Sequence, residues 1–142
     1  MEYMKDLIDA KYHLSVTERM YKSYFDFEEK RFLVGVINEL AKASTCIVRA
    51  YLLFEGVRGD GSKRNLRMFM GKVGPKYLEG EDVMNIFKSL EIEKAQKTSP
   101  VEFARGNKII LLVSGKYRFL TSERLSEFIN SVKTAILKFP SM

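Results

Sequence analysis

Residue types with specialised chemistry are almost missing from this chain of 142 residues. It has one cysteine, Cys46, one histidine, His13, and no tryptophan. A lone cysteine excludes an intrachain disulfide, and we therefore expect a cytoplasmic location. No CxxC or HxxxH pair exists, so the ligand spacing typical of a structural or catalytic zinc site is absent as well.

Long hydrophobic runs are also missing. No apolar stretch approaches the roughly 18 residues of a membrane span, because Lys or Arg interrupts every candidate. The opening segment, MEYMKDLIDAKYHL, carries acids where an export signal would have a basic end and an uninterrupted apolar core. With 46% apolar and 30% charged residues, the composition is that of a globular domain. We predict one domain over residues 1–142, with no membrane partner.

Helical periodicity dominates what is present. Apolar residues recur at the three-and-four spacing of a helix face in five segments, which span about 2–24, 28–55, 65–73, 80–96 and 123–139. A β-branched, apolar run at 108–113 returns after a glycine turn at 117–120, which predicts a hairpin. The expected fold is therefore mainly α, an antiparallel helical bundle with a small β-hairpin at about 108–120 before the C-terminal helix.

The second segment is apolar on two sides. Its first seam consists of Leu33, Ile37, Leu40, Ile47, Ala50 and Phe54. Its second seam consists of Val34, Ala41, Thr45, Val48 and Leu52. A helix with two apolar faces must be covered on both. We assign the first seam to the core of the monomer and predict that the second seam is the interface of a homodimer.

The net charge of +6 is unevenly distributed. Six bases accompany one acid in 56–76, and five bases accompany one acid in 97–118. Beside the glycines of the first stretch we take four bases as candidate polyanion-binding residues: Arg58, Lys63, Arg64 and Arg67. Arginine suits bidentate phosphate contacts. The alternative is a solvated loop whose charges only keep the protein soluble.

Aromatic residues lie among these bases and have two alternative roles. They are Phe69, Tyr77, Tyr117 and Phe119. Each could stack on a nucleobase or pack inward. For Phe119, together with Ile110 on the opposite strand, we expect inward packing.

No residue pattern supplies an enzyme mechanism. We expect His13 to face solvent beside Leu14, and Cys46 to pack in the core, since nothing near it favours a thiolate. The loop at 56–63 departs from the phosphate-binding pattern GxxxxGK[ST], because Ser62 stands where lysine should be and a helix precedes it. With no nucleophile, no partnered base and no cofactor motif, we predict a non-catalytic protein without a metal or other cofactor.

Residues 7–56 combine a helix with a spaced Ala/Leu seam, a short turn and a long helix that ends in Ala50-Tyr51-Leu52. This pattern resembles the helical-hairpin core of the HEPN superfamily. Ribonucleases of that family carry an arginine a few residues before a histidine near the later helices. Here no histidine follows His13 and no arginine precedes it. The resemblance therefore implies a catalytically silent member, of a kind that tends to form dimers and to bind nucleotides, RNA or a partner protein.

Two functions remain open from the sequence. The first is a non-catalytic helical interaction protein that forms a homodimer. The second is an RNA- or nucleotide-binding module that uses the basic loop 56–76 and the bases of 97–118, with an acidic protein as a further partner for the same charges. Salt dependence distinguishes the two, because phosphate contacts weaken steeply with salt and apolar pairing does not.

Overall fold

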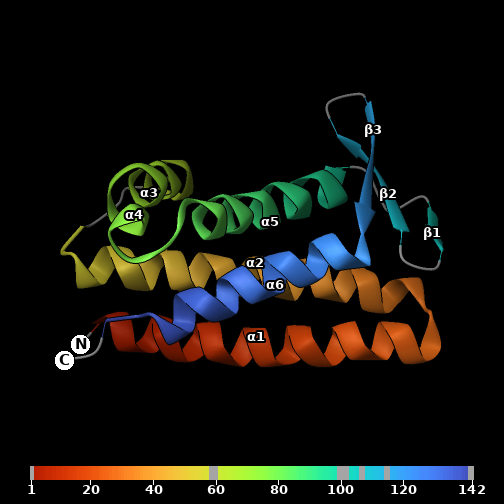
Figure 1. Cartoon of the computed structure of the whole chain (residues 1–142), viewed down its shortest axis with the longest axis horizontal. Helices are drawn as coiled ribbons and strands as arrows, with labels where there is room; N and C mark the ends of the chain where they lie inside the picture. The colour runs from red at the N-terminus through yellow and green to blue at the C-terminus, as the bar shows by residue number, and fades with distance from the viewer. Residues whose placement is uncertain (1, 58–60, 99–102, 106–107, 114–115, 141–142) are drawn as a thin grey trace.

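The chain folds as an antiparallel helical bundle with a small sheet at one end, as predicted (Figure 1). The computed structural model describes residues 2–57, 61–98, 103–105, 108–113 and 116–140. Its elements are α1 (Glu2–Phe27), α2 (Lys30–Phe54), α3 (Ser62–Met68), the π-helical turn η1 (Phe69–Val73), α4 (Gly74–Tyr77), α5 (Gly80–Thr98), β1 (Phe103–Arg105), β2 (Lys108–Val113), β3 (Lys116–Thr121) and α6 (Ser122–Leu137). Within these residues, no helix has both the length and the apolar character needed to cross a membrane.

The helices α1 and α2 run antiparallel along the whole length of the bundle (Figure 1). The buried apolar residues of α1 belong to the side that packs on α2. The helix continues through Ser15 without a break. At the end of α2, Gly56 has a φ of 74° and donates its N–H to the Leu53 carbonyl at 3.0 Å. The Val57 N–H bonds to the Leu52 carbonyl at 2.8 Å. These two bonds satisfy the last free carbonyls, so glycine ends α2 as the sequence predicted.

Central among the helices is α2, which contacts α1, α5, α6, α3 and η1. The first predicted seam lies in the core, where Leu33, Ile37, Leu40, Ile47 and Ala50 are at most 2% exposed. Phe54, at the end of the seam, is only partly buried and packs against Tyr3 and Phe139.

The second seam of α2 is mostly buried inside the same chain. Ala41, Val48 and Leu52 are at most 5% exposed, Val34 is half-buried, and Thr45 alone is exposed. The inference that this seam is left open for a second copy is therefore wrong, because α5 and the α3–η1 segment pack on α2. The homodimer itself stays a prediction that needs another surface.

Polar side chains fix how α5 sits between α2 and α6. Ser44 and Ser89 share a buried hydrogen bond of 2.7 Å between their hydroxyls. The Asn85 amide donates to the Ser131 hydroxyl at 3.0 Å, and that hydroxyl donates to Asp82 at 2.8 Å. Small serines allow the helices to approach closely, and each of these buried polar groups has a hydrogen-bond partner on the facing helix. The Ser44–Ser89 pair sets α5 against α2, and the Ser131 pairs set it against α6.

The short helical segment after the basic loop differs from its prediction. We expected a helix over 65–73 that stops before Gly74-Pro75. Instead α3 begins at Ser62, passes into η1 and continues into α4, with Pro75 in the first turn. Proline is tolerated there because the first turn of a helix needs no N–H from it. A Cβ on Gly74 would lie 2.9 Å from the Phe69 carbonyl oxygen, so this continuation requires glycine.

The predicted hairpin is confirmed as β2 and β3, and β1 adds a third antiparallel strand in the order β1-β2-β3. Ile110 lies opposite Phe119. Leu120 is 6% exposed, whereas Phe119 is 70% exposed. Successive side chains on a strand point to opposite faces, so a buried Leu120 places Phe119 outward. The expectation that Phe119 packs inward is therefore wrong.

The last helix begins where the sequence predicted. Thr121 is its N-cap, and its hydroxyl accepts the Arg124 N–H at 3.1 Å. Further along, the Ala135 carbonyl accepts a 2.6 Å hydrogen bond from the buried Tyr51 hydroxyl of α2. This bond joins the C-terminal ends of α2 and α6, and burial raises the pKa of Tyr51, which stays neutral.

Candidate ligand-binding groove

A groove follows the line between α2 and α5 and is divided into two compartments. The α3 compartment has a volume of about 600 Å³ and is lined by Thr45, Val48, Arg49, Gly61, Lys63, Asn65, Leu66, Arg67, Met70, Phe87, Leu90, Glu93 and Lys94. The α1 compartment has a volume of about 630 Å³ and is lined by His13, Asn38, Ala41, Lys42, Thr45, Cys46, Arg49, Glu93, Gln96 and Lys97. Both volumes fall within the range of about 300–1,000 Å³ that is typical of small-molecule sites.

The two compartments adjoin, because Thr45, Arg49 and Glu93 line both of them. Arg49 is held in place by Asp6 of α1. Its guanidinium Nη2 donates a hydrogen bond of 2.8 Å to Oδ1 of the Asp6 carboxylate. This bond raises the pKa of Arg49, which remains charged. A cationic residue with a fixed position therefore lies at the junction of the groove.

Basic side chains outnumber acidic ones around the groove. Six cations line it, namely Lys42, Arg49, Lys63, Arg67, Lys94 and Lys97, whereas Glu93 is the one lining carboxylate among the described residues. Three of the cations are paired: Arg49 with Asp6, Lys42 with Glu39 at 3.2 Å, and Lys97 with Glu93 at 2.6 Å. The positive charge that no carboxylate balances among the described residues therefore belongs to the other three cations.

Those three cations, Lys63, Arg67 and Lys94, all line the α3 compartment. They are exposed, and no carboxylate in the described ranges pairs with them. Lys63 and Arg67 lie four residues apart on α3, which places them on the same face of the helix. Lys94 faces them from α5. An anion that enters this compartment therefore meets positive charge from two helices.

The four predicted polyanion-binding residues divide accordingly. Lys63 and Arg67 line the groove. Arg64 is exposed on α3 but is not among the lining residues. Arg58 lies outside the described residues. The charge run was visible in the sequence, but Lys42, Arg49 and Lys94 come from distant segments, and no local pattern marked them.

Apolar side chains make the other wall of the α3 compartment. Leu66 and Met70 face Phe87 and Leu90 across it, with Val48 of α2 between them. Phe87 and Leu90 of α5 are only half-buried. Their remaining exposed surface lies in the compartment. For Phe69 the sequence left stacking and inward packing open, and the structure buries it fully. Phe87, which the sequence did not propose as a stacking residue, lines the compartment instead.

Each compartment has one unsatisfied carboxamide in its wall. Among the described residues, the buried side-chain oxygens and nitrogens without a hydrogen-bond partner are Asn65 Oδ1 and Asn38 Oδ1. Asn65 lines the α3 compartment, and Asn38 lines the α1 compartment. A buried acceptor without a donor costs about 1–3 kcal/mol. Both oxygens are covered by protein atoms, so an N–H of a ligand would supply the missing donor only after the carboxamide turns into the compartment.

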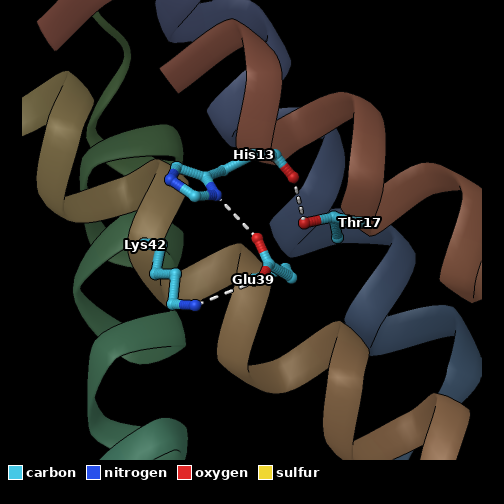
Figure 2. A network of polar contacts seen from close by, with 4 residues as sticks. All are labelled: His13, Thr17, Glu39 and Lys42. Atoms are coloured by element: carbon cyan, nitrogen blue, oxygen red, sulfur yellow. Dashed lines mark hydrogen bonds and ion pairs between the residues drawn. The ribbon is translucent and has the colours of Figure 1, made fainter. Parts of the chain in front are cut away.

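His13 lies at the α1 end of the groove and is half-buried, where the sequence predicted a solvent-facing residue. Figure 2 shows its ring pointing at Glu39, and Nδ1 lies 2.6 Å from Oε2 of that carboxylate. Lys42 donates to the other carboxylate oxygen at 3.2 Å. The Thr17 hydroxyl donates to the His13 backbone carbonyl at 2.7 Å. These contacts hold the His13 ring in place at the wall of the α1 compartment, where it can act as a binding or a structural group.

Substitution of Glu39 by Gln is expected to lower the free energy of unfolding by about 1 kcal/mol at neutral pH. Burial alone would raise the pKa of Glu39, but hydrogen bonds from His13 and Lys42 outweigh it and hold the pKa below 4.5. The stabilisation is therefore complete above that pH and disappears as the pH falls through the lowered pKa. Urea denaturation of both proteins between pH 7 and about pH 3 measures this. A difference that stays constant down to pH 3 would contradict it.

Cys46 has no neighbour that activates it. Burial raises the pKa of its thiol, and the positive charge of Arg49 does not offset this. Asp6 and Asp9 approach the sulfur, with the ligand atoms of the three residues within 4.8 Å of one another. Asp6 is already bonded to Arg49, and a protonated thiol is a poor metal ligand. The cluster is therefore explained as an ion pair beside a core cysteine.

No protein-family model, curated protein or solved structure matches this chain. The resemblance to the HEPN superfamily thus remains a prediction from the sequence pattern.

Proposed function

We propose that this protein is a non-catalytic binding module that holds a polyanion in the groove between α2 and α5. The observation that carries the proposal is the excess of cations there, with Lys63, Arg67 and Lys94 uncompensated around one compartment. Of the two functions left open by the sequence, this favours the nucleic-acid or nucleotide-binding alternative over the interaction protein. The role of the groove is binding, because no activated nucleophile lies beside His13 or Cys46 among the described residues.

Charge at this position acts in two ways. Several cations that line one concave surface raise the local concentration of an anionic ligand and accelerate its capture. The guanidinium of Arg67 suits bidentate contact with a phosphate, while Lys63 and Lys94 act as point charges. Contacts of this kind position a phosphate backbone without reading its sequence. The expected binding is therefore tolerant of sequence and sensitive to salt.

The test is binding of a fluorescein-labelled oligouridylate of about eight nucleotides, followed by fluorescence anisotropy. Measurable affinity is expected at about 50 mM salt, with the logarithm of the binding constant falling linearly against the logarithm of salt concentration. About three phosphate contacts on a single strand predict a slope near −2. Unlabelled heparin, which has no bases, should compete. Absence of binding at 50 mM salt would overturn the proposal.

The homodimer is a separate proposal and concerns a different surface. On the outer side of α1, Met4, Ile8 and Tyr12 are 42%, 58% and 61% exposed and recur every four residues. This stripe is apolar surface of the kind that a second copy covers. The dimer would leave the groove accessible, so the two proposals are compatible.

A further inference from the structure

We infer that the polyanion is a single-stranded nucleic acid and that the α3 compartment seats one of its bases. This inference rests on the proposed function. It goes further because any polyanion would pair with the cations, whereas the inference requires a polyanion that carries bases. Three features of the α3 compartment lead to it: an apolar wall, an unsatisfied acceptor, and cations at the edge.

The apolar wall suits a flat ring. Phe87 and Leu90 approach from α5, and Leu66 and Met70 approach from the opposite side. All four are half-buried, so each packs against the protein and still offers apolar surface to a ligand. Every base has an apolar face that stacks on an aromatic or packs on a methionine, independent of sequence. A phosphate or a sulfate would gain nothing from this wall, because neither has an apolar face.

Asn65 favours a ligand that also carries a hydrogen-bond donor, which the apolar wall does not require. Its Oδ1 is buried without a donor, in the compartment that also holds the uncompensated cations. Base edges carry ring and exocyclic N–H groups, which are the donors that an asparagine side chain accepts. Rotation of a side chain on binding is common and would turn the carboxamide toward the base. Asn38 places a second carboxamide oxygen without a donor in the wall of the α1 compartment, on the other side of Arg49.

The two compartments together suit a single strand better than a duplex or an acidic peptide. In a duplex the bases are stacked and paired, so none is free to enter a compartment between two helices. A peptide that packs apolar side chains on Phe87 carries charge at only some of its residues. A nucleic acid carries a phosphate at every residue, which matches cations that continue from Lys63 to Lys97.

The experiment compares three ligands of about eight nucleotides by anisotropy at one salt concentration: oligothymidylate, an abasic deoxyribose-phosphate strand of equal length, and a duplex. Oligothymidylate should bind about tenfold more tightly than either of the others. Phe87→Ala should remove this advantage and leave the affinity for the abasic strand unchanged. Asn65→Leu should reduce the advantage in the same direction, and it removes no core side chain if Phe87→Ala fails to fold. Oligouridylate and oligodeoxyuridylate, which differ only in the 2′-hydroxyl, measured in parallel report whether the compartment prefers RNA or DNA.

The outcomes separate the two levels of the proposal. Equal affinity for oligothymidylate and the abasic strand would overturn the base seat and leave polyanion binding intact. A preference for oligothymidylate that persists in both variants would place the base elsewhere and overturn the inference. Stronger binding of a poly-glutamate peptide than of any nucleic acid would assign the groove to an acidic protein. Failure of every ligand to bind would overturn the proposed function itself.

Discussion

Replacement of Leu52 by Glu is expected to lower the free energy of unfolding by about 4 kcal/mol or more, which is a large part of the about 5–15 kcal/mol that stabilises a typical domain. Leu52 is 2% exposed and belongs to the main core cluster. The substitution removes a fully buried apolar side chain and puts a carboxylate in its place. No described cation pairs with this position, so the new charge has to be neutralised or the helix end has to open. Urea denaturation followed by circular dichroism measures the loss.

Thr45→Glu is the matched control, because Thr45 belongs to the same predicted seam but is exposed. Its effect on the free energy of unfolding should stay within about 0.5 kcal/mol. The sequence, by contrast, assigned both residues to a dimer interface, where each substitution would give a folded monomer. A folded, stable Leu52→Glu protein that sediments at half the mass of the wild type would therefore support the interface and contradict the packing of α2.

The second large effect concerns ligand binding. The double substitution Lys63→Glu and Arg67→Glu should weaken oligouridylate binding at about 50 mM salt by about a hundredfold, since each lost phosphate contact contributes about 1.4 kcal/mol. The salt slope should flatten by about 1.4, because two contacts with a single strand are lost. Both residues are exposed, and no described carboxylate pairs with them, so stability should barely change. Anisotropy titrations at several salt concentrations give both quantities.

Lys11→Glu together with Lys22→Glu is the control for overall charge. Both lysines are exposed on α1 and neither lines the groove. The change in net charge equals that of the test variant. If position in the groove matters, this control should weaken binding only slightly, through long-range attraction that salt screens. Equal losses in the two variants would mean that net charge alone drives binding.

The amino-acid sequence by itself determined the four long helices, the end of α2 and the start of α6. Periodic apolar residues, Gly56 after α2 and the hydroxyl of Thr121 before α6 act within a few residues of each other, and such local effects are readable without a fold. The hairpin was readable for the same reason, since β-branched residues flank a glycine turn. The charge excess in 56–76 was equally visible, and it identified Lys63 and Arg67, which line the groove.

Only the tertiary structure decided what each surface meets. The second seam of α2 was read as free because nothing local shows that α5 and η1 cover it. His13 faces Glu39, and Arg49 faces Asp6, across separations of 26 and 43 residues that no periodicity encodes. Lys94 and Phe87 became groove residues because α5 packs beside α3 on the same side of α2. A sequence pattern fixes which side of a helix is apolar, whereas the partner that covers it depends on how all the helices share one core.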